Sequence, residues 1–250
     1  MRIIILLLLL YQTVTAPAQE PGVYKEPSKK ALAYRDFRAS LSTPPYELIK
    51  VKALIKKIKD NPDKDNPDMG ASALTPAVYD ALPLRGKFTY TMIHPEIYSQ
   101  NCAVFPMQPD EENKIFGQLI SWMDESTWSD RQLDFLRSNK DSVMYLIKES
   151  VNRSNRMGVN YKDAVVEADA WEMIPFLVHF YTNNKKDKDV LTTLMLLMKK
   201  GQYSAFIHSP SYKKLYGAES NYETALNYNK ANETLILERA SGYYELKNKK

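Results

Sequence analysis

The stretch DVLTTLMLLMKKG, Asp189 to Gly201, is apolar on nearly every side of a helix. Two lysines and then a glycine stand at its carboxyl end, where basic residues and glycine often close helices. A helix that is apolar all round is buried on all sides. We therefore expect this segment to form a helix at the centre of the core.

Helical patterns cover most of the chain around this segment. Apolar residues recur at helical spacing from Leu48 to Ile58, after two prolines and before Asn61-Pro62. Pro175 interrupts a longer apolar stripe, because proline removes a backbone hydrogen bond within a helix. We expect further helices in Pro109–Met123, after Ser129, in Asn160–Tyr181 with Asn160 as its cap, in Ser209–Gly217 and in Asn221–Leu246.

One region departs from the helical pattern. The sequence KFTYTMI, Lys87 to Ile93, is rich in β-branched and aromatic residues, and CAVF, Cys102 to Phe105, repeats the feature. Both predict short strands of one hairpin. The sequence therefore predicts a mainly α protein, either an antiparallel helical bundle or a short helical-hairpin stack, with a small β-hairpin near residues 87–105.

The first residues have the features of an export signal. Arg2 precedes an apolar run that ends before Ala16-Pro17-Ala18. This predicts a cleaved signal peptide at 1–18, an irregular lead-in at 19–45 and a single mainly helical domain at 46–250. We expect a secreted or periplasmic protein with no integral membrane segment after signal removal, because the run is too short to span a bilayer. The sequence has one cysteine, which excludes an intramolecular disulfide.

Charge and motif content argue against several functional classes. The formal net charge is only +4, whereas nucleic-acid binders concentrate a larger basic excess on one face. The sequence carries no glycine-rich phosphate loop and no histidines at metal-binding spacing. The Asn/Asp-rich loop 60–70 lacks the closing glutamate of a calcium loop, so a solvated turn is the main interpretation and a metal site the alternative. We expect no cofactor, no metal and no nucleic-acid partner.

The ten residues SWMDESTWSD, Ser121 to Asp130, allow two interpretations. As helix punctuation, Ser129 and Gln132 form a capping box that Trp128 precedes, while Trp122 belongs to the apolar face of the preceding helix. As a sugar site, the tryptophans and the acids flank a cleft. The two adjacent acids of the stretch project in different directions, and helix punctuation accounts for more of the residues.

The tyrosine-rich C-terminal third supplies most of the candidate binding residues. Tyrosine buries its ring while keeping a polar tip, which suits contact surfaces. The alternative is an amphipathic helix that packs half-exposed rings. Our leading hypothesis is a non-enzymatic binding module for a protein or glycan, with the candidate residues Tyr203, Tyr212, Tyr216, Tyr222 and Trp128.

A glycan-cleaving hydrolase with a helical fold is the second hypothesis. Asp169 and Glu172 share one face if their segment is helical, and two close carboxyl groups can hold one pKa high enough for a general acid. The candidate catalytic residues are Glu125, Glu167, Asp169 and Glu172.

Overall fold

The computed structural model describes residues 26–59, 61–63, 66, 68–102, 107–221 and 223–249. These residues form a mainly helical structure with small antiparallel sheets, which confirms the predicted fold class. The helices are α1 (Lys29–Ala39), α2 (Leu48–Ile55), α3 (Pro76–Asp80), α4 (Leu84–Ile93), α5 (Asp130–Ser138), α6 (Lys140–Ser154), α7 (Val159–Glu167), α8 (Ile174–Asn183), α9 (Asp189–Lys200), α10 (Ser204–Ile207), α11 (Pro210–Tyr216) and α12 (Lys230–Asn248). The strands are β1 (Asn61–Pro62), β2 (Met69–Ala71), β3 (Ile97–Ser99), β4 (Lys114–Phe116), β5 (Ser126–Thr127) and β6 (Ala225–Asn227), and the 3₁₀ turns are η1 (Glu111–Asn113), η2 (Ile120–Met123) and η3 (Trp171–Met173).

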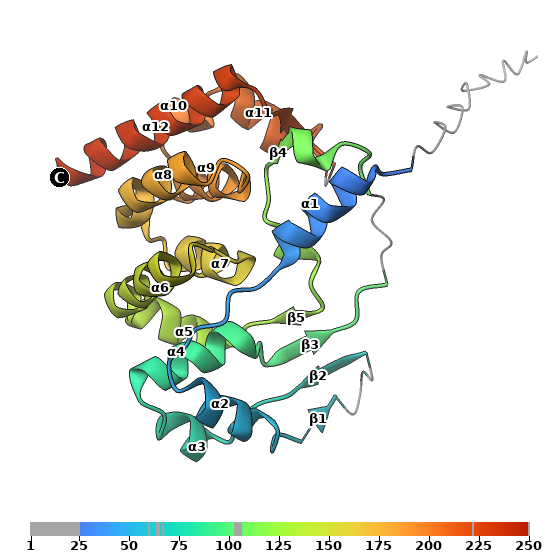
Figure 1. The fold of residues 1–250 in the computed structure, drawn as a ribbon, viewed down its shortest axis with the longest axis vertical. Helices are drawn as coiled ribbons and strands as arrows, with labels where there is room; N and C mark the ends of the chain where they lie inside the picture. Colours follow the sequence, from blue (N-terminus) through green and yellow to red (C-terminus); the bar gives the residue numbers. More distant parts are fainter. Residues whose placement is uncertain are drawn as a thin grey trace, which may run out of the picture.

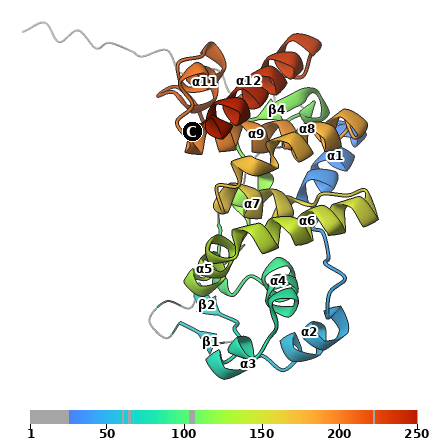
Figure 2. The same ribbon diagram turned by 90° about the vertical axis from the view of Figure 1, so that its left-hand side faces the viewer.

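The helices follow one another in layers along the long axis of the molecule (Figures 1 and 2). The pair α2 and α3 lies at one end, α4 to α7 lie in the middle, and α12 covers α8 and α9 at the other end. Strands β1, β2, β3 and β5 form one antiparallel sheet beside this stack. The layered order favours the helical-hairpin stack over a closed bundle.

Helix α9 is the central helix, as its apolar sequence predicts. It contacts α7, α8, α10 and α12. Val190, Leu191, Leu194 and Leu197 are all fully buried in the main core. Because other elements pack against several sides of α9, this segment has no polar face.

The strand predicted at Lys87–Ile93 is wrong, because these residues belong to helix α4. Phe88 and Met92 enter the main core, whereas Tyr90 enters a second cluster that contains Val51. The helix is therefore buried on more than one side, and this packing overrides the strand preference of its residues. The strand in this region is β3, which pairs with β2 and β5. Most of the second expected strand, residues 103–106, lies outside the described part of the chain.

The irregular lead-in predicted at residues 19–45 is wrong where it includes α1. Ser28 caps this helix by accepting a hydrogen bond from the Ala31 N–H. Tyr34 and Arg38 form part of its buried face. The helix is not recognisable as amphipathic in the sequence, because a charged residue occupies a position that normally holds an apolar one.

The helix predicted at Pro109–Met123 is also wrong, since this segment forms η1, β4 and η2. Strand β4 pairs with β6, so that Ile115 lies opposite Leu226. The same pairing explains why the last helix begins at Lys230 and not at Asn221. Strands β4 and β6 are far apart in sequence, and each provides hydrogen-bond partners for the backbone of the other. The local sequence pattern of either segment does not indicate this pairing.

Several local predictions are confirmed. The helix predicted from Leu48 begins there and ends slightly early, at Ile55. Pro175 stands in the first turn of α8, so the segment predicted as a helix at Asn160–Tyr181 is divided between α7 and α8. Ser209 caps α11, its Oγ accepting a hydrogen bond of 3.1 Å from the Tyr212 N–H.

The export and redox predictions are tested in part. The predicted signal peptide lies outside the described residues. Within the described part of the chain, every helix is too short or too polar to cross a bilayer. Cys102 is exposed and is the one cysteine of the sequence, which agrees with the absence of an intramolecular disulfide.

Residues before α2 are joined tightly to the start of α7. The Gly158 N–H donates to Ser42 Oγ at 2.7 Å, and Asn160 Nδ2 donates to the Ser42 carbonyl at 2.8 Å. The prediction that Asn160 caps a helix is wrong, because α7 already begins at Val159 and the amide is used in this junction.

Alanine at position 158 is expected to destabilise the protein by about 2–3 kcal/mol, because overpacking a closed junction costs energy of this order. A Cβ on Gly158 would lie 2.2 Å from the Ser42 backbone nitrogen, so the backbone must move. Urea denaturation measures the effect. Gly242→Ala is the control: its Cβ would meet only the Tyr203 hydroxyl at 3.1 Å, and alanine favours the helix there. Equal stability of the two variants would contradict this close approach.

Candidate functional site

A cavity of about 790 Å³ opens between α7 and the chain from Gln118 to Trp128. Leu41, Pro95 and Leu196 complete its walls. We call this cavity the Trp122 cleft. Its volume falls within the range of about 300–1,000 Å³ that is typical of small-molecule sites.

The stretch Ser121–Asp130 forms most of one wall of the cleft and also contains the cap of α5. Ser129 and Gln132 form the predicted capping box, and α5 begins at Asp130. Trp128, just before the cap, lines the cleft and donates from Nε1 to the Thr91 carbonyl at 2.8 Å. This hydrogen bond fixes the orientation of the indole.

Trp122 is placed differently from the prediction. It was expected on the buried face of a helix, but it lies in the short turn η2 and is 42% exposed. The turn replaces the expected helix because β4 ends just before it. As a result, the indole lines the cleft instead of entering the core.

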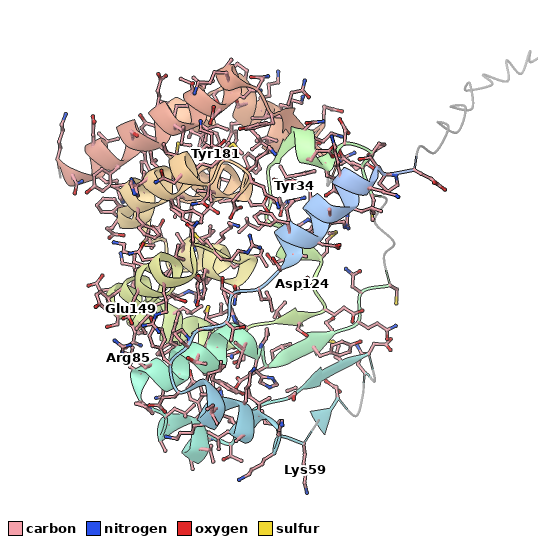
Figure 3. The ribbon with its side chains drawn as sticks, in the orientation of Figure 1. Tyr34, Lys59, Arg85, Asp124, Glu149 and Tyr181 are labelled. Carbon is pink, nitrogen blue, oxygen red and sulfur yellow. The ribbon has the colours of Figure 1, made fainter. Side chains whose placement is uncertain are left out.

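Four carboxyl groups line the Trp122 cleft, namely those of Asp124, Glu125, Asp163 and Glu167. Asp163 Oδ1 accepts a hydrogen bond of 2.8 Å from Ser121 Oγ across the two walls. The pKa of Asp163 is raised to about 7, mainly by burial and in smaller part by the nearby charge of Asp124. Partial burial also raises the pKa of Asp124. Figure 3 shows Asp124 beside the segment that leads into β5, on the side of the molecule that carries α1.

The structure brings two of the four candidate catalytic acids to the cleft. Glu125 lines it and accepts a hydrogen bond from the Asn101 N–H at 3.2 Å. Glu167 also lines it and forms an ion pair with Arg137.

The other two candidate acids lie outside the lining of the cleft. Asp169 follows α7 in a left-handed backbone conformation, with φ of 46°. Glu172 is exposed and forms an ion pair of 2.7 Å with Lys140. The shared helix face that was expected for Asp169 and Glu172 is therefore wrong, because a turn separates the two residues.

The candidate tyrosines pack mainly on one another and on the core, away from this cleft. Tyr212 and Tyr216 have ring centroids 5.0 Å apart, and both meet the edge of Phe206. Tyr203 packs on Tyr243 at 5.3 Å. Tyr222 lies outside the described residues. This arrangement matches the alternative interpretation of half-exposed rings that cover a core.

A second cavity of about 350 Å³ adjoins the cleft and shares Gln118, Trp122 and Met123 with it. We call it the Arg35 cavity. Its charged lining residues are Arg35, Arg38, Lys199, Glu111 and Glu223, and the Lys199 ammonium lies 4.2 Å from the centre of the Tyr216 ring. Trp122 thus stands between an acidic cleft and a cavity that carries basic groups.

Asp163 and Asp124 are the site residues that the sequence analysis missed. Asp163 lies inside an ordinary helical segment, and its role depends on a partner, Ser121, that is distant in sequence. Asp124 belongs to the stretch Ser121–Asp130. It was not chosen as a candidate because adjacent acids such as Asp124 and Glu125 project in different directions. Only the fold shows that Asp124 faces a carboxyl group of another element.

Among the described residues, no three His, Cys, Asp or Glu side chains converge as a metal site. Part of the Asn/Asp-rich loop 60–70 lies outside those residues. Comparison of the chain with protein-family models, with curated proteins and with solved structures gives no match.

Proposed function

We propose that this chain is a non-enzymatic carbohydrate-binding protein and that the Trp122 cleft holds the sugar. The observation that supports this proposal is the presence of two indole rings, Trp122 and Trp128, with four carboxyl groups in one cavity. An indole face packs against the apolar face of a sugar ring, and carboxylates accept hydrogen bonds from its hydroxyl groups. The Arg35 cavity has only one indole, Trp122, and its lining mixes basic with acidic side chains.

The predicted export signal agrees with this proposal. A secreted or periplasmic protein meets polysaccharides and glycoconjugates outside the cytoplasm. A protein partner remains an outcome of the same binding experiments, because an indole-lined cavity also accepts protein side chains.

A glycan-cleaving activity is the second candidate function, and one observation favours it. The carboxyl group of Asp163, with a pKa of about 7, is partly protonated at neutral pH and lies near Asp124 in the same cleft. Two carboxyl groups with different roles are what glycoside hydrolysis requires. Release of new reducing ends from a tetrasaccharide, abolished by Asp163→Asn, supports this candidate. Intact sugar after prolonged incubation excludes it for that substrate.

Trp122→Ala is expected to weaken sugar binding by about tenfold to a hundredfold, because a central aromatic anchor often contributes 2 kcal/mol or more. Calorimetric titration with tetrasaccharides of glucose, of N-acetylglucosamine and of glucosamine measures the affinity. Trp171→Phe is the matched control: Trp171 packs on Tyr244 at 5.9 Å and does not line the cleft. The control should bind like the original chain. Unchanged binding by Trp122→Ala, or no binding of any tested sugar to the original chain, would contradict the proposal.

A further inference from the structure

We propose that the Trp122 cleft selects a sugar that carries a protonated amine, such as a glucosamine unit, over neutral sugars. This inference rests on the proposed function and adds the chemical class of the ligand. Three observations support it: the sign of the charge in the cleft, the position of its carboxyl groups and the identity of its aromatic rings.

The charge of the cleft has one sign. Its lining contains four carboxyl groups, and among the described residues that form it there is no Lys, Arg or His. Glu167 is already compensated by Arg137, and Glu125 already accepts a backbone hydrogen bond. Asp124 and Asp163 form no ion pair within the described part of the chain. Asp163 accepts one hydrogen bond, from Ser121, but neither carboxyl group has a paired cation among the described residues, so each can still take an ammonium.

The two available carboxyl groups come from opposite walls and influence each other. The charge of Asp124 raises the pKa of Asp163, so the two groups are close enough to repel when both are ionised. A ligand ammonium between them would favour the ionised form of Asp163 and form charge-assisted hydrogen bonds with both carboxylates. A neutral hydroxyl at the same place can donate to the carboxylates, but it offsets no charge.

The aromatic rings favour the same ligand class. Trp122 and Trp128 both line the cleft, and tryptophan binds cations over its ring face more strongly than the other aromatic residues. The Arg35 cavity, which shares Trp122, is lined by Arg35, Arg38 and Lys199 as well as by Glu111 and Glu223, so it lacks the purely acidic lining of the Trp122 cleft. The charge distribution therefore directs an amine to the Trp122 cleft and away from its neighbour.

Three tetrasaccharides with the same linkage, built from glucosamine, N-acetylglucosamine or glucose, test the inference. They differ in one substituent on each ring, and only the first is cationic. Calorimetric titration near pH 6, where the sugar amines are largely protonated, should give about tenfold tighter binding of the glucosamine oligomer. Added salt should weaken this preference.

Two variants locate the effect. Asp124→Asn removes one carboxylate from an exposed position, so the fold should be kept, and circular dichroism checks this. It should reduce binding of the glucosamine oligomer about fivefold to tenfold and change binding of the neutral oligomers less than twofold. Glu172→Gln removes an exposed carboxylate outside the cleft and should change neither.

The outcomes separate the inference from the proposed function. Equal or tighter binding of a neutral oligomer overturns the amine preference and leaves sugar binding in place. Absence of binding by all three oligomers overturns both. Glucosamine binding that survives both Asp124→Asn and Trp122→Ala reflects attraction to the general surface and also overturns the inference.

Discussion

Replacement of Arg38 by methionine is expected to lower the free energy of unfolding by about 3–5 kcal/mol, because it leaves the buried Asp189 carboxylate without its cation. Arg38 Nε lies 3.0 Å from both carboxylate oxygens of Asp189, and Nη1 lies 3.3 Å from Glu111. Its guanidinium also lies 4.0 Å from the centre of the Phe116 ring. The side chains of Arg38, Asp189 and Glu111 are all at least nine-tenths buried, so water does not replace the lost partner.

Urea denaturation of Arg38→Met and Arg35→Met compares a buried with a more exposed arginine. Arg35 pairs with the same Glu111 at 2.8 Å, but its side chain is 22% exposed. Its replacement should therefore cost clearly less, since Arg38 continues to compensate Glu111. A loss for Arg38→Met no larger than that for Arg35→Met would show that α1 is not held to α9 by this buried network.

The second large effect concerns pH. The pKa of Asp163 is about 7 in the folded protein, against an ordinary value of 3.8, because burial disfavours its charged form. Between these values the unfolded chain has lost a proton that the folded chain retains. Stability from this group is complete below about pH 4 and falls as pH rises to about 7, by up to about 4 kcal/mol.

Asp163→Asn removes this dependence, because asparagine stays neutral at every pH. The variant should match the original chain near pH 4 and exceed it in stability near pH 8. Among the groups around Asp163, Asp124 and Asp189 raise its pKa, whereas Ser121 and Lys162 lower it. Urea denaturation across this pH range measures the difference, with Glu172→Gln as the exposed control. Parallel pH profiles for Asp163→Asn and the original chain would contradict the buried, protonated state of Asp163.

Sequence patterns predict the parts of this fold that depend on local rules. The capping box at Ser129, the helix interruption at Pro175 and the nearly all-apolar α9 each follow from residues within a few positions of one another. Such features can be predicted without information about the rest of the chain. Their confirmation supports the prediction that the chain after residue 125 is mainly helical.

The wrong predictions have causes that are not local. Helix α4 resembles a strand because Phe88 and Tyr90 enter two different cores. Helix α1 is hidden because Arg38 takes a buried position opposite Asp189, which lies far along the sequence. The segment Lys114–Phe116 becomes a strand because it meets β6. In each case, a distant partner decides the local conformation.

In the candidate site too, the features that depend on local sequence were predicted and those that depend on distant partners were not. The stretch Ser121–Asp130 was recognised as either helix punctuation or part of a sugar site, and in the structure it caps α5 and also lines the Trp122 cleft. The candidate tyrosines were predicted from composition alone, and Tyr203, Tyr212 and Tyr216 pack away from this cleft. Asp163 was missed because its hydrogen bond to Ser121 and its burial depend on how α7 meets η2.

The most direct test of sugar binding is a crystal structure of the chain soaked with the glucosamine tetrasaccharide. Our account predicts a sugar ring against the Trp122 indole, with its amine within hydrogen-bonding distance of the Asp124 or Asp163 carboxyl group. Sugar bound at another surface, with the Trp122 cleft empty, would contradict it.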